Sequence, residues 1–242
     1  MKKFFYKDLE STNLEAARLI ENGLLSDNAW IRAKHQWGGR GQGHHSWVSE
    51  SGMNLTGTLV LFSGLPRARD QFDLSRLCSL AVADFLELFL HDVKIKWPND
   101  LYHLDDKIGG ILIEAAVMGE QLHSAIIGIG LNINQVDFSA EIPNPVSLKK
   151  ITGVHYDLQQ LDDLLLQSLE NRLIIQKPNS WKVTRKEYLS KLYRYREFAP
   201  FKADGKWFRG RILDVDPMGH LIMEDENKMQ HSFAFQEVEY IL

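Results

Sequence analysis

The sequence of 242 residues contains a single cysteine, Cys78, so it can form neither an internal disulfide nor a cysteine-rich zinc site. This cysteine lies in the apolar stretch 74–90, where we expect it to be a small buried hydrophobic residue. No run of about 18 apolar residues occurs, which predicts no membrane-spanning helix. The N-terminus has no apolar segment long enough for a secretion signal. We therefore expect a soluble cytoplasmic protein that does not bind membranes.

The chain also lacks an excess of basic residues. It has 28 lysines and arginines against 32 acidic residues, a formal net charge of −4. This balance argues against non-specific nucleic-acid binding as the main role, because proteins that follow a phosphate backbone are normally basic. Hydrophobic residues make up 44% of the chain, which is enough for a sizeable core. The length suits one large domain, alone or with a small appendage.

Several familiar catalytic motifs are missing as well. The glycine-rich segment 37–44 is not a dinucleotide-binding GxGxxG loop, because His44 occupies its sixth position, and no GK[ST] follows as in a phosphate-binding Walker loop. No HExxH metal motif and no GxSxG nucleophile motif occurs. His44 and His45 are adjacent, and adjacent side chains do not converge easily on one metal ion. The segment has no apolar periodicity, which predicts a loop.

The first half of the chain alternates between helices and strands. Thr12 and Glu15 fit a capping box, which predicts a helix that ends at Asn22-Gly23. Asp73 is the expected cap of a buried helix over 74–90. Apolar and β-branched runs predict strands over 30–34, 54–62, 93–97, 107–116 and 124–132. The last two strands are continuous apolar runs, as expected where helices cover one face of a sheet.

The second half predicts two amphipathic helices, over 158–173 and 181–195, and then a change of texture. After Pro200, glycines separate short alternating runs such as 208–213 and 221–224, which is typical of a small all-β module. We place the domain boundary near Phe198, giving a main domain over 1–197 and a second over 198–242. The predicted class is α+β, with a mixed or antiparallel sheet in the main domain.

Four segments carry the candidate chemistry: 11–13 (STN), 36–47 (QWGGRGQGHHSW), 96–114 (KWPNDLYHLDDKIGGILIE) and 128–134 (GIGLNIN). Each alone could be a helix cap, a turn or a site of close strand packing. Together, in this order and at these intervals, they closely resemble the motifs of the biotin–protein ligases, also called holocarboxylase synthetases. The resemblance is strong over about residues 9–135. The C-terminal module resembles the small SH3-like β barrel that ends many members of that family.

The resemblance implies a two-step reaction. Biotin and ATP give biotinyl-AMP and pyrophosphate, and a lysine of a biotin carboxyl carrier domain then attacks the adenylate. Because the carboxylate of biotin must attack an anionic phosphate, the site needs cations and backbone donors around the forming anhydride. Lys107 and Arg40 match the family's catalytic cations. Magnesium would bind through the ATP phosphates, with Asp100 as a candidate ligand.

The resemblance also assigns binding roles residue by residue. Its biotin-binding positions are Ser11, Thr12, Asn13, Gln36, Gly39, Lys107, Gly109 and Gly110. Its ATP-binding positions are Arg40, Gly41, Gln42, Trp47, Asn99, Asp100, Lys107 and Asn132. Hydroxyl and amide groups suit the ureido ring of biotin, and the flat indole of Trp47 suits a purine.

The glycine-rich segment departs from the family pattern. Gln42 stands where some relatives have a second arginine, and His44 and His45 replace a further basic residue. One hypothesis is that Arg40 and Lys107 hold more of the adenylate's charge. A sharper one is that His45 is a titratable cation, so that adenylate retention weakens as pH rises from about 6 to 8. The alternative, that His45 is an ordinary surface residue, stays open.

Some relatives begin with a DNA-binding helix-turn-helix domain, for which the helix at Thr12 leaves no room, so we expect ligation without repressor activity. Two other functions remain open. One is lipoate or octanoyl transfer, although the arginine- and glycine-rich motif of those enzymes is absent. The other is a non-catalytic biotin sensor, which the intact Lys107 disfavours. The protein could be a monomer or a homodimer.

Overall fold

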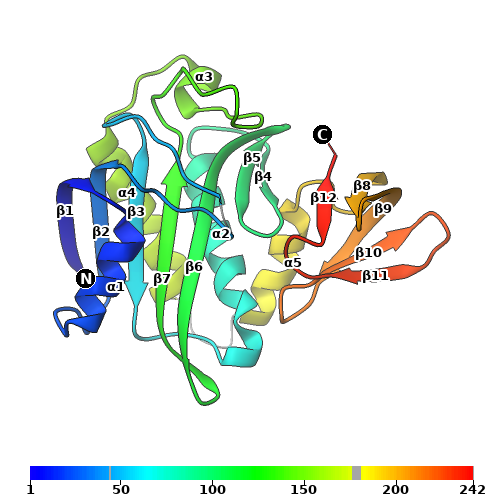
Figure 1. The fold of residues 1–242 in the computed structure, drawn as a ribbon, viewed down its shortest axis with the longest axis horizontal. Coiled ribbons are helices and arrows are strands. Elements are labelled where there is room, and N and C mark those ends of the chain that lie inside the picture. Colours follow the sequence, from blue (N-terminus) through cyan, green and yellow to red (C-terminus); the bar gives the residue numbers. More distant parts are fainter. Residues whose placement is uncertain (44, 176–180, 242) are drawn as a thin grey trace.

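The computed structural model describes residues 1–43, 45–175 and 181–241 (Figure 1). Its main part is a seven-stranded mixed sheet in the order β1-β2-β3-β7-β6-β5-β4. Only β1 and β2 are parallel neighbours; the other pairs are antiparallel. The strands are β1 (Lys2–Leu9), β2 (Ala29–Gln36), β3 (Leu55–Leu61), β4 (Val93–Lys96), β5 (Asp100–His103), β6 (Asp106–Met118) and β7 (Gln121–Leu131).

Helices lie on both faces of this sheet, the larger ones on one face. The helices are α1 (Thr12–Glu21), α2 (Phe72–Glu87), α3 (Leu148–Thr152), α4 (Leu158–Glu170) and α5 (Trp181–Lys191), with a 3-10 helix at Ala68–Asp70 and a π-helix at Asn171–Ile175. Figure 1 shows α2 and α4 behind the sheet, α5 beside α2 toward the C-terminal strands, and α1 in front of the sheet. The α+β class with a mixed, helix-covered sheet is therefore confirmed. No helix among the described residues is long and apolar enough to cross a membrane.

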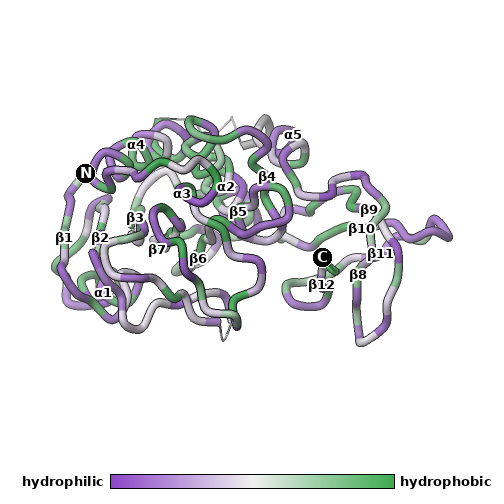
Figure 2. Tube along the Cα trace, turned by 90° about the horizontal axis from the view of Figure 1, so that it is seen from above, coloured by the Kyte–Doolittle hydropathy of each residue, from purple (hydrophilic) through white to green (hydrophobic). Residues whose placement is uncertain are grey.

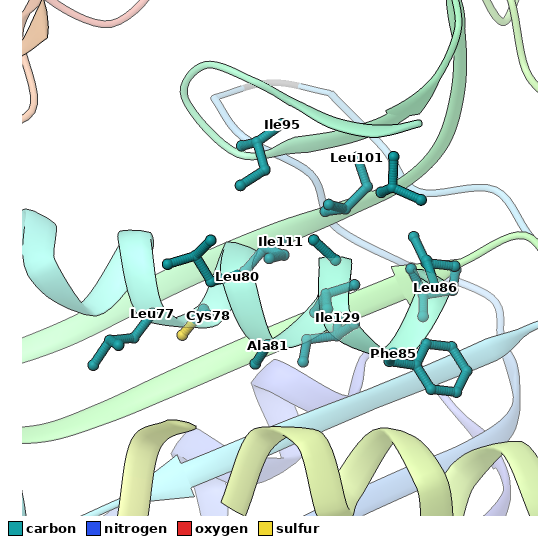
Figure 3. Packing of buried hydrophobic residues seen from close by; sticks show 14 of the residues in the cluster. Leu77, Cys78, Leu80, Ala81, Phe85, Leu86, Ile95, Leu101, Ile111 and Ile129 are labelled. Carbon is teal, nitrogen blue, oxygen red and sulfur yellow. The ribbon is translucent and has the colours of Figure 1, made fainter. Parts of the chain in front are cut away.

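Strand alternation gives the two faces of the sheet different roles. On β7, the side chains of Ile127 and Ile129 join the main core with α2. Figure 3 shows Ile129 beside this helix. On the opposite face, the same strand presents Gly128 and Gly130, which leave open backbone under α1 and the glycine-rich loop. Cys78 is fully buried in the main core, as the sequence predicts, and burial raises the pKa of its thiol.

Two helix caps differ from the sequence predictions. Ser11, not Thr12, precedes the first helical residue, and Glu15 accepts hydrogen bonds from Tyr6 and Arg18 instead of closing a capping box. The predicted cap Asp73 lies inside the first turn of α2, where it pairs with Arg76. In each case an arginine one turn further along the same helix binds the carboxylate that the capping motif is expected to use. The helices themselves begin within two residues of their predicted starts.

The C-terminal module is a five-stranded antiparallel sheet in the order β11-β10-β9-β8-β12. Its strands are β8 (Ala199–Ala203), β9 (Lys206–Val215), β10 (Leu221–Asp225), β11 (Gln230–Phe233) and β12 (Val238–Tyr240). Among the described residues, β11 and β12 do not pair, so the sheet is open, which corrects the closed SH3-like β barrel that the family resemblance implied. Figure 2 shows the module beside the main part of the molecule. The boundary at residue 198 remains a prediction.

Polar and aromatic contacts fasten this module to α2 and to the turn after β4. Arg76, only 3% exposed, donates hydrogen bonds of 2.7 Å and 2.9 Å to the carbonyls of Val215 and Asp216. The indole N–H of Trp97 donates to the carbonyl of Gly219 at 2.9 Å, and the Trp97 ring packs against Phe235. These contacts hold the C-terminal strands close to the 96–100 segment.

We expect Arg76→Ala to destabilise the protein by about 3 kcal/mol, because it breaks a buried ion pair and removes the hydrogen bonds from Arg76 to two carbonyls. Burial already raises the pKa of Asp73, and the substitution removes the cation that opposes this effect. Urea unfolding of the variant checks this. The matched control is Arg69→Ala, since Arg69 is 73% exposed and only pairs with its neighbour Asp70. Equal stability of both variants would contradict the assignment.

Candidate active site

A cleft of about 860 Å³ opens on the face of the sheet that carries α1. Strands β3, β6 and β7 form its floor. Its walls come from four parts of the chain: the start of α1, the glycine-rich loop, the turn at 96–100 and the segment 138–145. Residues of the C-terminal module complete the rim. The volume lies within the range of roughly 300–1,000 Å³ that is typical of small-molecule sites.

Hydroxyl and amide groups form a connected network at one end of the cleft. Gln36, the last residue of β2, accepts hydrogen bonds through Oε1 from the Thr12 backbone N–H at 2.6 Å and from the Thr12 hydroxyl at 3.0 Å. Thr58 on β3 places its Oγ1 2.7 Å from both Thr12 Oγ1 and Asn13 Oδ1. Ser11, Thr12 and Asn13 are all buried. This end of the cleft therefore presents fixed donors and acceptors to a polar ring.

The floor of the cleft exposes the backbone of β7, because two glycines of this strand occupy the positions that face the cleft. A Cβ atom on Gly128 would lie 2.4 Å from Asn13 Oδ1, and one on Gly130 would lie 2.4 Å from Trp47 Cε2. Trp47 thus lies against the backbone of β7. Such approaches are open only to glycine. The two glycines therefore set the depth of the cleft at both ends.

The described residues on the two sides of the glycine-rich loop pair with each other. Arg40 and Ser46 form an antiparallel bridge, and Trp47 donates its backbone N–H to the Gly39 carbonyl at 2.9 Å. Gly39 does not line the cleft; a Cβ there would lie 2.3 Å from the Trp47 carbonyl oxygen. Its role is therefore close packing within the loop. Arg40, Gly41 and Gln42 do line the cleft.

The two histidines of the loop, His44 and His45, differ in what the structure describes. His44 falls outside the described residues. His45 is exposed and lines the cleft, and its carbonyl accepts from the Gly41 N–H at 2.8 Å. Its proposed role as a titratable cation stays a prediction.

Lys107 lies opposite a carboxylate within the cleft. Its Nζ is 2.6 Å from Asp100 Oδ1, and the two side chains are 30% and 22% exposed. Its backbone is held on both sides, since its N–H donates to the Asn144 carbonyl at 2.8 Å and its carbonyl accepts from Val146 at 2.9 Å. The cation is therefore fixed in place and already partnered by an anion.

Asn99 and Asn132 line the cleft, but they use their amide N–H groups to hold its walls. Asn99 Nδ2 donates to the Ile111 carbonyl at 2.5 Å, and Asn132 Nδ2 donates to the Val146 carbonyl at 3.1 Å. Gly110 lines the cleft, whereas Gly109 faces the core, where a Cβ would lie 2.4 Å from Leu131 Cδ2. The cleft thus brings together every predicted site residue except Gly39 and Gly109.

Several cleft residues lie outside the sequence prediction. Lys96 places its Nζ 3.0 Å from the Tyr102 hydroxyl and 5.1 Å from the centre of the Tyr240 ring. Burial lowers the pKa of this ammonium group, and the nearby Asp100 opposes the shift. Gln236 reaches the loop, since a Cβ on Gly43 would lie 2.4 Å from its Nε2. Lys96 belongs to the KWPND motif, but the contributions of the C-terminal module have no sequence signal.

Among the described residues, no three or more histidine, cysteine, aspartate or glutamate side chains cluster as a metal site. The carboxylates that line the cleft are Asp100, Glu141 and Glu239. This set fits a magnesium ion that is carried mainly by phosphate oxygens and completed by one or two carboxylates, which is how proteins usually hold it.

The model of the Biotin/lipoate A/B protein ligase family matches residues 8–132, more than half of the chain, and these residues include three of the four motif segments and the fourth as far as Asn132. The chain belongs to this family. A biotin–[acetyl-CoA-carboxylase] ligase of Paracoccus denitrificans is 38% identical over 164 residues, covering 64% of this chain and 66% of its own. The bifunctional ligase/repressor BirA of Bacillus spizizenii is 30% identical over 171 residues, covering 69% and 52%.

The matched region thus spans about half to two thirds of the length of these relatives. The structural similarity to solved ligases extends over more of the chain than the sequence similarity does. A biotin protein ligase from Aquifex aeolicus, solved in complex with biotin and ATP, superposes with a TM-score of 0.80 at 23% identity and covers 99% of both chains. The arrangement of the seven-stranded sheet and the C-terminal module is therefore that of a known ligase fold.

Proposed function

We propose that this protein activates biotin with ATP to form biotinyl-AMP and transfers the biotinyl group to a lysine of a biotin carboxyl carrier domain. The observation that carries the proposal is one cleft that joins a network of buried hydroxyl and amide groups to two cations, Arg40 and Lys107. The names of the related ligases support the same substrate. We propose no DNA-binding role, in keeping with the net charge of −4.

The first step needs a binding site for a neutral ring and an anion together. The ureido group of biotin has two N–H donors and one carbonyl acceptor, which match the amide and hydroxyl groups of Asn13, Gln36 and Ser11. The valerate carboxylate would then extend along the floor toward Lys107. There the ammonium group offsets the repulsion between the carboxylate and the α-phosphate. The residues hold and orient both reactants, so most of the rate comes from positioning and electrostatics.

The nucleotide would occupy the end of the cleft that Trp47 lines, with its purine against the indole and its phosphates near Arg40. When bound, magnesium would neutralise part of the charge on the leaving pyrophosphate. Asp100 is the residue best placed to contact it, because this carboxylate lines the cleft beside Lys107. Binding there requires Asp100 to share its oxygens between the metal ion and Lys107.

The adenylate must persist until the acceptor lysine arrives, so water must be kept away from the anhydride. The glycine-rich loop and the C-terminal module already touch through Gly43 and Gln236. We propose that these two parts together cover the adenylate, with the acceptor lysine entering between them.

The test is transfer to a purified acceptor domain. The protein, ATP, magnesium and biotin should raise the intact mass of a biotin carboxyl carrier domain by one biotinyl group. An acceptor whose target lysine is replaced by arginine should not change mass. Lipoate and octanoate are tested as alternative substrates, and pyrophosphate release measures the activation of each acid. Faster release with either acid than with biotin would refute the proposal, and tight biotin binding without transfer would indicate a sensor.

A further inference from the structure

Glu114 lies next to the cleft and connects its two ends. It is on β6 and points to the same side of the sheet as Gly110. Its Oε2 accepts a hydrogen bond from Asn13 Nδ2 at 2.8 Å, and its Oε1 lies 3.3 Å from Arg40 Nη1. One carboxylate therefore holds a residue at the start of α1 and the arginine of the glycine-rich loop at the same time.

The contact with Asn13 fixes which way its amide points. An ionised carboxylate can only accept hydrogen bonds, so the Nδ2 group of Asn13 must face Glu114. The Oδ1 atom then faces Thr58, whose Oγ1 is 2.7 Å away, and the bare backbone of Gly128. With a neutral partner the amide could flip, and the acceptor at this end of the cleft would become a donor.

The contact with Arg40 is of a different kind. The two side chains are 47% and 38% exposed, and an ion pair exposed to this degree contributes little to stability and is easily exchanged. A phosphate group offers Arg40 a stronger, charge-assisted and bidentate partner. The pair with Glu114 therefore holds Arg40 close to the cleft without preventing it from binding a nucleotide.

We infer that Glu114 is a positioning residue of this site, which orients Asn13 for the ring of biotin and holds Arg40 until the phosphates of ATP replace it. The inference rests on the proposed function. A positioning role can be distinguished from a purely structural one, because loss of each of the two contacts should affect the binding of a different substrate. Loss of the Asn13 contact should weaken biotin binding, whereas loss of the Arg40 contact should leave ATP binding unchanged or stronger.

The experiment compares Glu114→Ala and Glu114→Gln with the wild-type protein. Glu114→Ala should raise the Kd for biotin, measured calorimetrically without ATP, about tenfold, the loss expected for a hydrogen bond to a charged group. Glu114→Gln should give a smaller rise, because glutamine still accepts from Asn13. The KM for ATP should stay equal or fall in both variants. The matched control, Glu120→Gln, makes the same charge change in the exposed turn of the β6–β7 hairpin and should leave both constants unchanged.

A double-mutant cycle then tests the route of the effect. In the Asn13→Ala background, Glu114→Ala should change the Kd for biotin by less than about twofold, because the contact it removes is already lost. A full tenfold loss in that background, a wild-type Kd in Glu114→Ala, or a larger defect for ATP than for biotin would each overturn the inference. If the wild-type protein itself binds no biotin, the proposed function fails; if it binds and only Glu114 has no effect, the inference alone fails.

Discussion

Lys107→Ala should reduce ATP-dependent biotinylation by about a thousandfold, since removing one group that stabilises a developing charge typically costs this much. The loss has two parts. The cleft loses a fixed cation, and Asp100, whose Oδ1 was 2.6 Å from the ammonium group, becomes an uncompensated anion beside the reacting carboxylate. Pyrophosphate release measures the first step, and circular dichroism checks that the variant is folded. Near-normal turnover would refute the assignment of Lys107.

The second part of this loss can be isolated by removing the anion as well. In Asp100→Asn/Lys107→Ala the repulsion disappears while one side-chain oxygen remains to contact magnesium, so activity at saturating magnesium should recover by about tenfold relative to Lys107→Ala without approaching the wild type. Lys206→Ala is the control, because Lys206 is exposed in the C-terminal module and touches no part of the cleft. An effect of similar size in this control would show that net charge, and not the position of Lys107, governs the rate.

The sequence predicts the larger elements of the fold well because they bury long apolar runs. Strands β6 and β7 and helix α2 come from such runs. Strand β1 is absent from the prediction: three of its eight residues are lysines and Phe5 is 64% exposed, so its alternation is weak and its pairing with β2 decides its structure. Strand β5 has only four residues and follows directly on the turn at Pro98.

Local motifs mislead where another partner competes for the same atoms. Thr12 is predicted as a helix cap, but its hydroxyl donates to Gln36, which lies 24 positions away on β2. Asp73 is likewise taken by Arg76, which joins α2 to the C-terminal module. For Thr12 a long-range hydrogen bond replaces the local one that the motif suggests, and for Asp73 an ion pair with a residue one turn further along the helix does so.

The sequence motifs predict which residues belong to the site, but they do not predict how these residues are arranged. Gly109 and Gly110 are adjacent, so one must face the core and the other the cleft, and only the register of β6 against β7 decides which. Thr58, Glu114 and Tyr240 reach the site or its edge from three different strands. Their contribution depends on strand order, which the sequence alone does not determine.

The two glycines of β7 should affect different ligands when each is replaced by alanine. A methyl group on Gly128 would collide with Asn13, which Thr58 and Glu114 hold in place, so the Kd for biotin should rise about a hundredfold, as expected when a binding group is displaced by about 1 Å. A methyl group on Gly130 would collide with the Trp47 ring, so the KM for ATP should rise by a similar factor.

The glycines lie two residues apart on the same face of one strand, so each variant is the control for the other. Both should lose about 1–3 kcal/mol of stability through overpacking, measured by urea unfolding, and this shared cost does not separate them. The separation comes from the ligands: biotin binding should stay within about twofold of the wild type in Gly130→Ala, and ATP should do so in Gly128→Ala. Equal losses for both ligands in both variants would mean that the cleft is not divided into a biotin end and a nucleotide end, and that the floor of β7 responds as one unit.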